Sequence, residues 1–152
     1  MPRLAAFGLT VDLPHGWEGR ARRREPEPGA TTRPILHAAS FPLPLERGDY
    51  GSGAVEQMTD DDVFVTLFEH DPGAAHSPLF ARQGRPDRLP PDDFNPFALQ
   101  RVLPGQSGLQ VFFTERDRAF CLYVVLGSHA RRFVLAPRAE AIVRTLDVQD
   151  FE

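Results

Sequence analysis

Residues 110–127, QVFFTERDRAFCLYVVLG, constrain the fold more than any other stretch of the chain. Two apolar runs, Leu109–Thr114 and Ala119–Leu126, flank a short charged segment, which is typical of a β-hairpin with its turn near Arg116 and Asp117. In the second run, both alternating sets of side chains are apolar. A strand that is apolar on both faces needs cover on both. We therefore expect Phe120–Leu126 in the middle of an antiparallel sheet, with helices or long loops packed on either side.

Alternating apolar residues or continuous apolar runs predict further strands. These are Gly8–Leu13, Trp17–Arg24, Ile35–Phe41 and Val63–His70. The first two are separated by the turn residues Pro14-His15-Gly16, so we expect them to pair as an N-terminal hairpin. Val63–His70 is predicted as a second central strand, and His37 is expected to lie half-buried in the sheet rather than to act as a ligand.

Apolar residues at helical spacing predict a helix over Pro137–Leu146, with proline at its start. A second, short helix is expected over Ala54–Met58, with Ser52 near its N-cap. Phe97–Leu103 is too short a run for periodicity to decide between helix and strand. The predicted fold is α+β, an antiparallel sheet of about six strands with helices packed on it, in one domain spanning residues 1–152.

Composition excludes several classes of function. No apolar run approaches the ~20 residues that cross a bilayer, so we expect no membrane insertion. The net charge is −4, and the basic residues are all arginine, which argues against nucleic-acid binding. Abundant arginine without lysine favours a GC-rich bacterial genome. The N-terminus lacks the longer apolar stretch of a signal peptide, so the expected location is the cytoplasm. The single cysteine, Cys121, is expected to be a buried thiol.

The best candidate for metal chemistry is the cluster Glu69, His70, Asp71 and His76 at the end of a predicted central strand. Imidazole and carboxylate groups can hold a divalent metal, but this spacing has no evident geometric rationale. A small-ligand or divalent-metal-binding protein is therefore the alternative hypothesis.

A hydrolase is a third hypothesis. It would require Ser128 or Cys121 to act as a nucleophile. Ser128 and His129 are sequence neighbours, and neighbours rarely have the geometry that a nucleophile and its base need. The chain matches no known catalytic motif, so we expect neither an enzyme nor a bound cofactor.

The candidates for partner binding are aromatic residues in predicted loops. Tyr50, Phe94 and Phe97 qualify, since aromatic side chains without a core to fill dominate interfaces. Arg22 and Arg24 lie on a predicted strand and serve either as solvated edge charge or as a patch for an acidic partner. The segments 46–53 and 76–95 are the predicted binding surface.

The opening GLTVDLPHGW, residues 8–17, resembles the start of PsbP/Mog1-like and DcrB-like domains. The later strand Arg118–Tyr123 and the terminal helix follow in the same order. The resemblance implies an α/β sandwich around an antiparallel sheet, with Trp17 packed under the first hairpin. Members of this superfamily share binding rather than catalysis. The leading hypothesis is a non-catalytic protein-binding module, an adaptor or chaperone-like subunit of a bacterial assembly.

Overall fold

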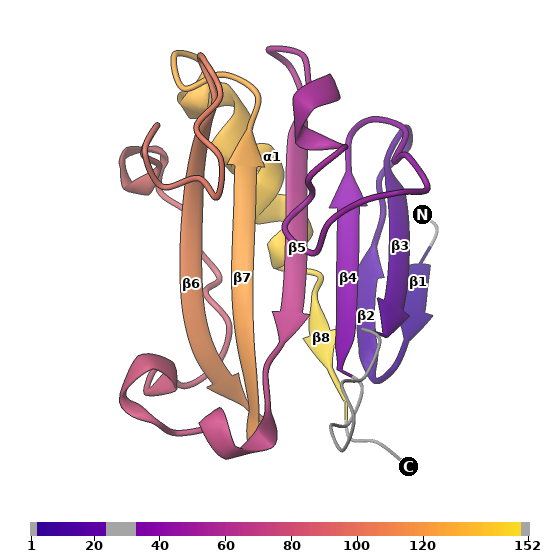
Figure 1. Ribbon diagram of the computed structural model, residues 1–152, viewed down its shortest axis with the longest axis vertical. Helices are drawn as coiled ribbons and strands as arrows, with labels where there is room; N and C mark the ends of the chain where they lie inside the picture. Colours follow the sequence, from indigo (N-terminus) through magenta and orange to yellow (C-terminus); the bar gives the residue numbers. More distant parts are fainter. Residues whose placement is uncertain (1–2, 24–32, 150–152) are drawn as a thin grey trace.

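The computed structural model describes residues 3–23 and 33–149, and in this part of the chain the regular elements form two antiparallel sheets and one α-helix (Figure 1). The strands are β1 (Arg3–Ala6), β2 (Leu9–Asp12), β3 (Glu18–Arg23), β4 (Pro34–Ala39), β5 (Val63–Glu69), β6 (Ser107–Glu115), β7 (Arg118–Leu126) and β8 (Asp147–Val148). The helix α1 spans Arg132–Val143, and 3₁₀ turns η1 to η4 span Val55–Gln57, Pro72–Ala74, Pro78–Phe80 and Pro91–Asp93. The α+β class is confirmed.

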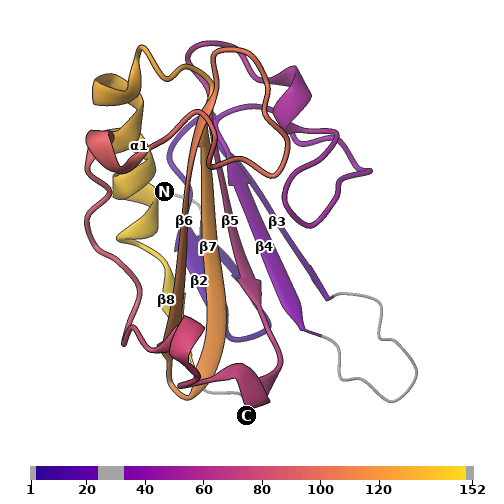
Figure 2. The ribbon, with the colours of Figure 1, turned by 60° about the vertical axis from the view of Figure 1, so that its left-hand side comes forward.

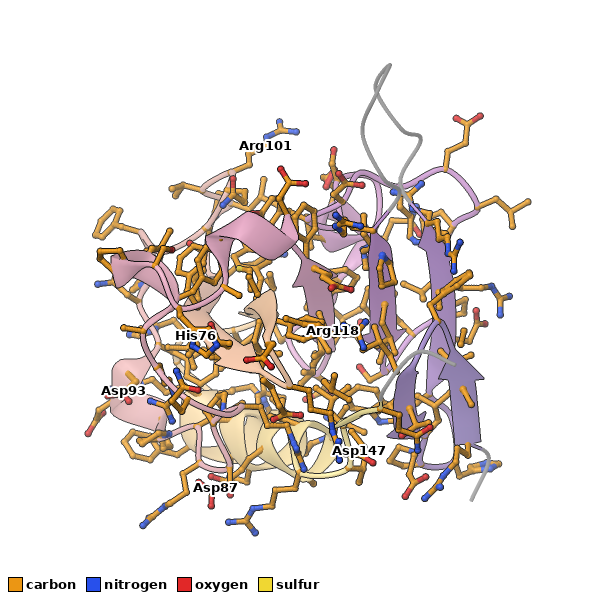
Figure 3. All side chains as sticks on the ribbon, turned by 90° about the horizontal axis from the view of Figure 1, so that it is seen from below. His76, Asp87, Asp93, Arg101, Arg118 and Asp147 are labelled. Atoms are coloured by element: carbon orange, nitrogen blue, oxygen red, sulfur yellow. The ribbon has the colours of Figure 1, made fainter. Side chains whose placement is uncertain are left out.

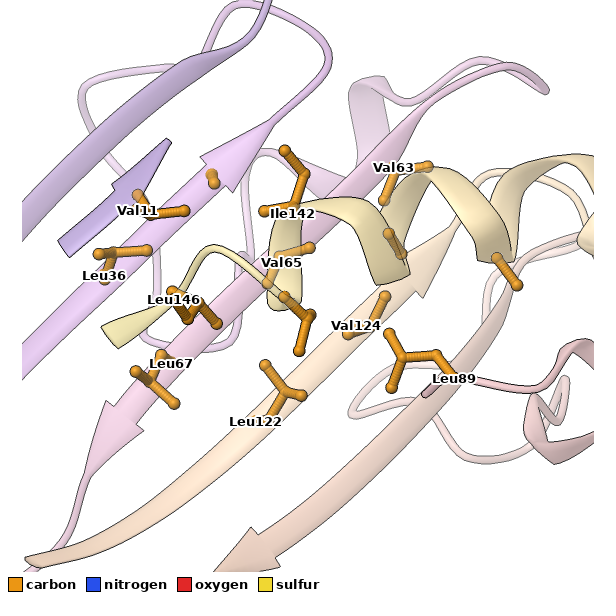
Figure 4. Packing of buried hydrophobic residues seen from close by; sticks show 14 of the residues in the cluster. Val11, Leu36, Val63, Val65, Leu67, Leu89, Leu122, Val124, Ile142 and Leu146 are labelled. Carbon is orange, nitrogen blue, oxygen red and sulfur yellow. The ribbon is translucent and has the colours of Figure 1, made fainter. Parts of the chain in front are cut away.

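The larger sheet has the strand order β3-β4-β5-β7-β6, so β5 and β7 are both interior strands. In β7, Phe120 and the residues at alternate positions after it face the main core, where α1 packs (Figure 4). Cys121, Tyr123 and Val125 face a second apolar cluster on the other side. Figure 2 shows α1 on one side of this sheet and long loops on the other. The predicted interior strand with cover on both faces is confirmed.

The hairpin of β6 and β7 is also confirmed. The two strands pair in continuous register from Ser107 opposite Leu126 to Glu115 opposite Arg118. Arg116 and Asp117 form the two-residue turn with φ of 51° and 58°. Positive φ at both positions gives the turn a twist that matches the strands it joins.

The predicted N-terminal hairpin is wrong. β2 pairs with β1 and with β8 in a separate three-stranded sheet, whereas β3 pairs with β4. Phe7 and Gly8 have φ of 55° and 77° and form a two-residue turn that folds β2 back on β1. Pro14 accepts a hydrogen bond from the N–H of Trp17, and this turn leads the chain into the other sheet. The expected single sheet of about six strands is therefore replaced by sheets of three and five strands in the described residues.

The predicted C-terminal helix starts earlier than expected, and Pro137 lies inside it. The hydroxyl of Ser128 accepts a hydrogen bond from the N–H of Arg131, and the carbonyl of Arg131 accepts one from Leu135. These contacts begin the helix ahead of the proline. Pro137 deletes one hydrogen bond of the helix, the one that Phe133 would accept. The buried face of α1 covers the sheet as predicted.

The two short segments of uncertain type are not regular elements. The expected helix at Ala54–Met58 is a single 3₁₀ turn, and no side chain, Ser52 included, caps it. Residues 97–103 form a turn and bends followed by irregular chain, rather than a helix or strand. Asn95 starts this loop, since its side-chain oxygen accepts the N–H of Phe97 at 2.7 Å. Within the described residues, no helix has the length and apolar character needed to cross a bilayer.

Candidate functional site

An open groove lies on the face of the larger sheet opposite α1, between two loops. Tyr123 and Val125 of β7 form its floor, residues 50–56 form one wall and residues 99–106 form the other. The groove encloses about 350 Å³, including the solvent at its mouth. Gln106 joins the walls, because its buried side-chain N–H donates to the carbonyl of Val55 at 2.7 Å. This hydrogen bond therefore ties the two walls of the groove to each other.

Aromatic rings lie in the floor of the groove and in the wall beside it. The ring of Tyr50 meets that of Tyr123 edge-on at 5.3 Å and stacks on Phe68 at 5.4 Å. The hydroxyl of Tyr123 accepts a hydrogen bond from the backbone N–H of Gln100 at 2.9 Å. Burial raises the pKa of Tyr123, so the phenol is neutral at pH 7. The floor and the wall beside it offer aromatic rings, and the hydroxyl group of Tyr123 on the floor is neutral.

The rim of the groove is charged on both sides. The carboxylate of Glu56 accepts two contacts, of 3.1 and 2.9 Å, from the N–H of Gly53. Arg101 lies on the opposite wall and is exposed, and in the described part of the chain it has no ion-pair partner. Figure 3 shows Arg101 at the margin of the molecule, directed outward. An apolar floor with a polar rim is the composition of a binding pocket.

The loop that carries Tyr50 is anchored to the sheet by His37, which is 1% exposed. His37 Nε2 lies 2.9 Å from the carbonyl oxygen of Asp49, and Nδ1 accepts a hydrogen bond from Arg47 at 2.9 Å. These partners define the neutral tautomer with the proton on Nε2. Burial, opposed by the hydrogen bond to Asp49 and reinforced by Arg47, lowers the pKa of His37 to about 4. The prediction of a sheet histidine is confirmed, with complete burial in place of half burial.

The predicted binding aromatics have different environments. Tyr50 lines the groove, and Phe97, which is 80% exposed, lies on the loop that forms the opposite wall. Phe94 is 3% exposed and belongs to the main core, so the expectation that it lacks a core to fill is wrong. Trp17 packs against the main core, as expected.

The predicted arginine patch is partly engaged within the chain. Arg22 pairs with Asp49 at 3.1 Å and donates to the carbonyl of Arg47 at 2.9 Å, so it braces the same loop. Arg24 lies outside the described residues. Segment 76–95 folds against the protein through the buried Leu89 and Phe94 rather than projecting as a free loop.

The four residues of the candidate metal cluster have separate partners. Glu69 is buried and forms a two-pronged ion pair with Arg118, at 2.7 and 3.0 Å. The ring of His70 packs among aromatic rings, Asp71 lies 3.9 Å from Arg33, and His76 lies 2.8 Å from Asp117. In residues 3–23 and 33–149, no group of three or more His, Cys, Asp or Glu side chains is placed to hold a metal ion.

The candidate nucleophiles have structural roles. Cys121 is fully buried, and burial raises the pKa of its thiol, which disfavours the reactive thiolate. The hydroxyl of Ser128 is engaged at the start of α1, and the N–H of His129 donates to the carbonyl of Gly105. Neither arrangement supports a hydrolase.

Sequence reasoning missed most of the groove. Gln100, Arg101, Gln106 and Tyr123 line it, and none was a candidate. The only signal was Tyr123 itself, a polar-tipped ring on an otherwise apolar strand face. Comparisons of the chain with protein-family models, with curated proteins and with solved structures found no match.

Proposed function

We propose that this protein is a non-catalytic protein-binding module, an adaptor or chaperone-like subunit of a bacterial assembly in the cytoplasm. The observation that carries the proposal is the groove lined by Tyr50 and Tyr123 beside a loop with two exposed apolar side chains, Phe97 at 80% and Val102 at 55%. Large exposed apolar groups beside a polar-rimmed groove are typical of a contact surface.

A second support is the resemblance of residues 8–17 to PsbP/Mog1-like and DcrB-like domains, which act by binding other molecules. Membership of this chain in that superfamily is part of the proposal. The hydrogen bonds of the groove favour binding over catalysis, since Tyr123 and Gln106 both use their polar groups to hold the walls.

The test is affinity purification of the tagged protein from its native source. We expect a stoichiometric protein partner with wild type and its loss with Phe97→Ser. Leu79→Ser is the matched control, because Leu79 is 59% exposed but lies in η3, at the opposite end of β6 from the groove loop. Isolation of wild type as a lone monomer, or equal loss of the partner in both variants, would contradict the proposal.

A further inference from the structure

The strand β6 forms one edge of the larger sheet, and both of its ends are already paired. Gly108 and Asn95 exchange two backbone hydrogen bonds of 3.0 Å. At the other end, the N–H of Thr114 donates to the carbonyl of Arg82, and its carbonyl accepts the N–H of Gly84, both at 2.8 Å. Each end of the strand is thus capped by another segment of the chain, Asn95 at one end and residues 82–84 at the other.

The middle of β6 is open. Successive residues of an edge strand direct their backbone groups alternately toward the sheet and away from it. The backbone groups of Gly108 and Thr114 point outward, so those of Gln110 and Phe112 point outward as well. The N–H and C=O groups of these two residues have no hydrogen-bond partner among the described residues. The distance along the strand between the two capped positions is about 20 Å at the usual rise per residue.

This open edge also lacks the usual protection. Natural edge strands carry charges, prolines or bulges that prevent pairing with another chain. The opposite edge, β3, carries Arg20, Arg22 and Arg23. By contrast, residues 109–113 of β6 read LQVFF, with no charge or proline, and pair with β7 without a bulge.

We propose that the middle of β6 binds a short extended segment of a partner polypeptide by β-strand addition. Outward N–H and C=O groups at strand spacing match the backbone of an extended peptide. The caps at Gly108 and Thr114 decide against a second copy of the chain, because a whole β6 laid alongside would occupy the places of Asn95 and Arg82. The inference rests on the proposed function and specifies how a protein partner docks.

The side chains that flank the open edge indicate which segment fits. Leu109 and Val111 are half-buried and pack against the main core on the helix side. On the other side, Phe112 packs against the ring of Phe80 at 5.4 Å, and Gln110 donates to Cys121. An added strand therefore meets an aliphatic surface on one face and an aromatic and amide surface on the other. β-branched and aromatic residues at alternate positions complement it.

A proline at position 110 tests the open edge without disturbing the pairing of β6 with β7. Because the N–H of Gln110 points outward, Gln110→Pro removes one outward donor and no hydrogen bond between β6 and β7, and proline is tolerated at such edge positions. Gln110→Ala is the matched control, since it also loses the contact with Cys121 but keeps the donor.

The experiment selects displayed random peptides of about twelve residues on the wild-type protein and measures their affinity for each variant. We expect selected peptides to bind Gln110→Pro at least about tenfold more weakly than Gln110→Ala. Val55→Trp, which fills the groove, serves as the third variant. Peptides that lose affinity only for Val55→Trp would overturn strand addition and leave the proposed function standing. Failure to select any peptide would count against both.

Amide hydrogen exchange of the wild-type protein supplies a readout that does not depend on a variant folding. We expect the amides of Gln110 and Phe112 to exchange rapidly and those of Leu109 and Val111 slowly, because only the latter pair face β7. A selected peptide should then protect Gln110 and Phe112. Slow exchange of these two amides in the free protein, or no protection by the peptide, would overturn the inference.

Discussion

Acidification should destabilise this protein through His37. The folded protein holds the pKa of this histidine at about 4, whereas an unfolded chain restores the ordinary value of about 6.5. The folded state therefore binds fewer protons between these two values, and its stability must fall as the pH falls through that window. The full effect is about 3 kcal/mol, since one pKa unit corresponds to about 1.4 kcal/mol.

The contacts explain why the proton is excluded. Nδ1 of His37 accepts a hydrogen bond from Arg47, so a proton there would set two donors against each other beside a second positive charge. The ring is 1% exposed and has no access to water that would stabilise the cation. Protonation must therefore be coupled to release of the loop that carries Asp49 and Tyr50.

The assay is urea unfolding at about pH 7.5 and about pH 5, for which linkage gives a loss of about 2 kcal/mol from His37 alone. Carboxylates and the other histidines titrate as well, so His37→Gln, which keeps a side-chain amide to face Asp49, supplies the background. We expect wild type to lose about 2 kcal/mol more than the variant over this interval. Equal losses in the two proteins would refute the reasoning.

Two further changes test other parts of the structure. Arg118→Met should lower the free energy of unfolding by about 3 kcal/mol or more in urea titrations, because it leaves the carboxylate of Glu69 buried without its partner. Arg118→Lys should recover part of this loss, and an Arg118→Met protein as stable as wild type would contradict the role of the ion pair. Tyr123→Phe should lower the free energy of unfolding by about 1 kcal/mol and speed amide exchange at Gln100, because the N–H of Gln100 loses its acceptor. Unchanged exchange at Gln100 would show that the hydroxyl does not hold the groove wall.

The interior strand was predictable because its evidence is local. Both alternating sets of side chains in Phe120–Leu126 are apolar, and the only environment that suits such a strand is a sheet covered on both faces. The turn at Arg116 and Asp117 was equally local, since two polar residues join two apolar runs. Features of this kind are decided within about twenty residues of sequence.

Strand pairing was not predictable in the same way. The alternation of Leu9 and Val11 indicates a strand but not its partner, and the pairing with β1 depends on a turn in which Phe7 adopts positive φ. Bulky residues rarely adopt that conformation, so Phe7 gives no turn signal and Gly8 alone indicates the turn. The groove was missed for a related reason. Its walls are joined by contacts between residues far apart in sequence, such as the bond from Gln106 to Val55.

A single loop, residues 95–106, shapes both proposed surfaces. Its first residue, Asn95, caps the open edge at Gly108, and its middle, with Gln100, forms a wall of the groove. The loop passes so close to Gly108 that a Cβ at that position would lie 2.5 Å from the carbonyl oxygen of Ala98. Glycine there is thus a condition for the loop to fold over the end of β6. The proposed peptide binds between the two caps and leaves Asn95 paired with Gly108, so the loop and the groove wall that it forms stay in place when the edge is occupied.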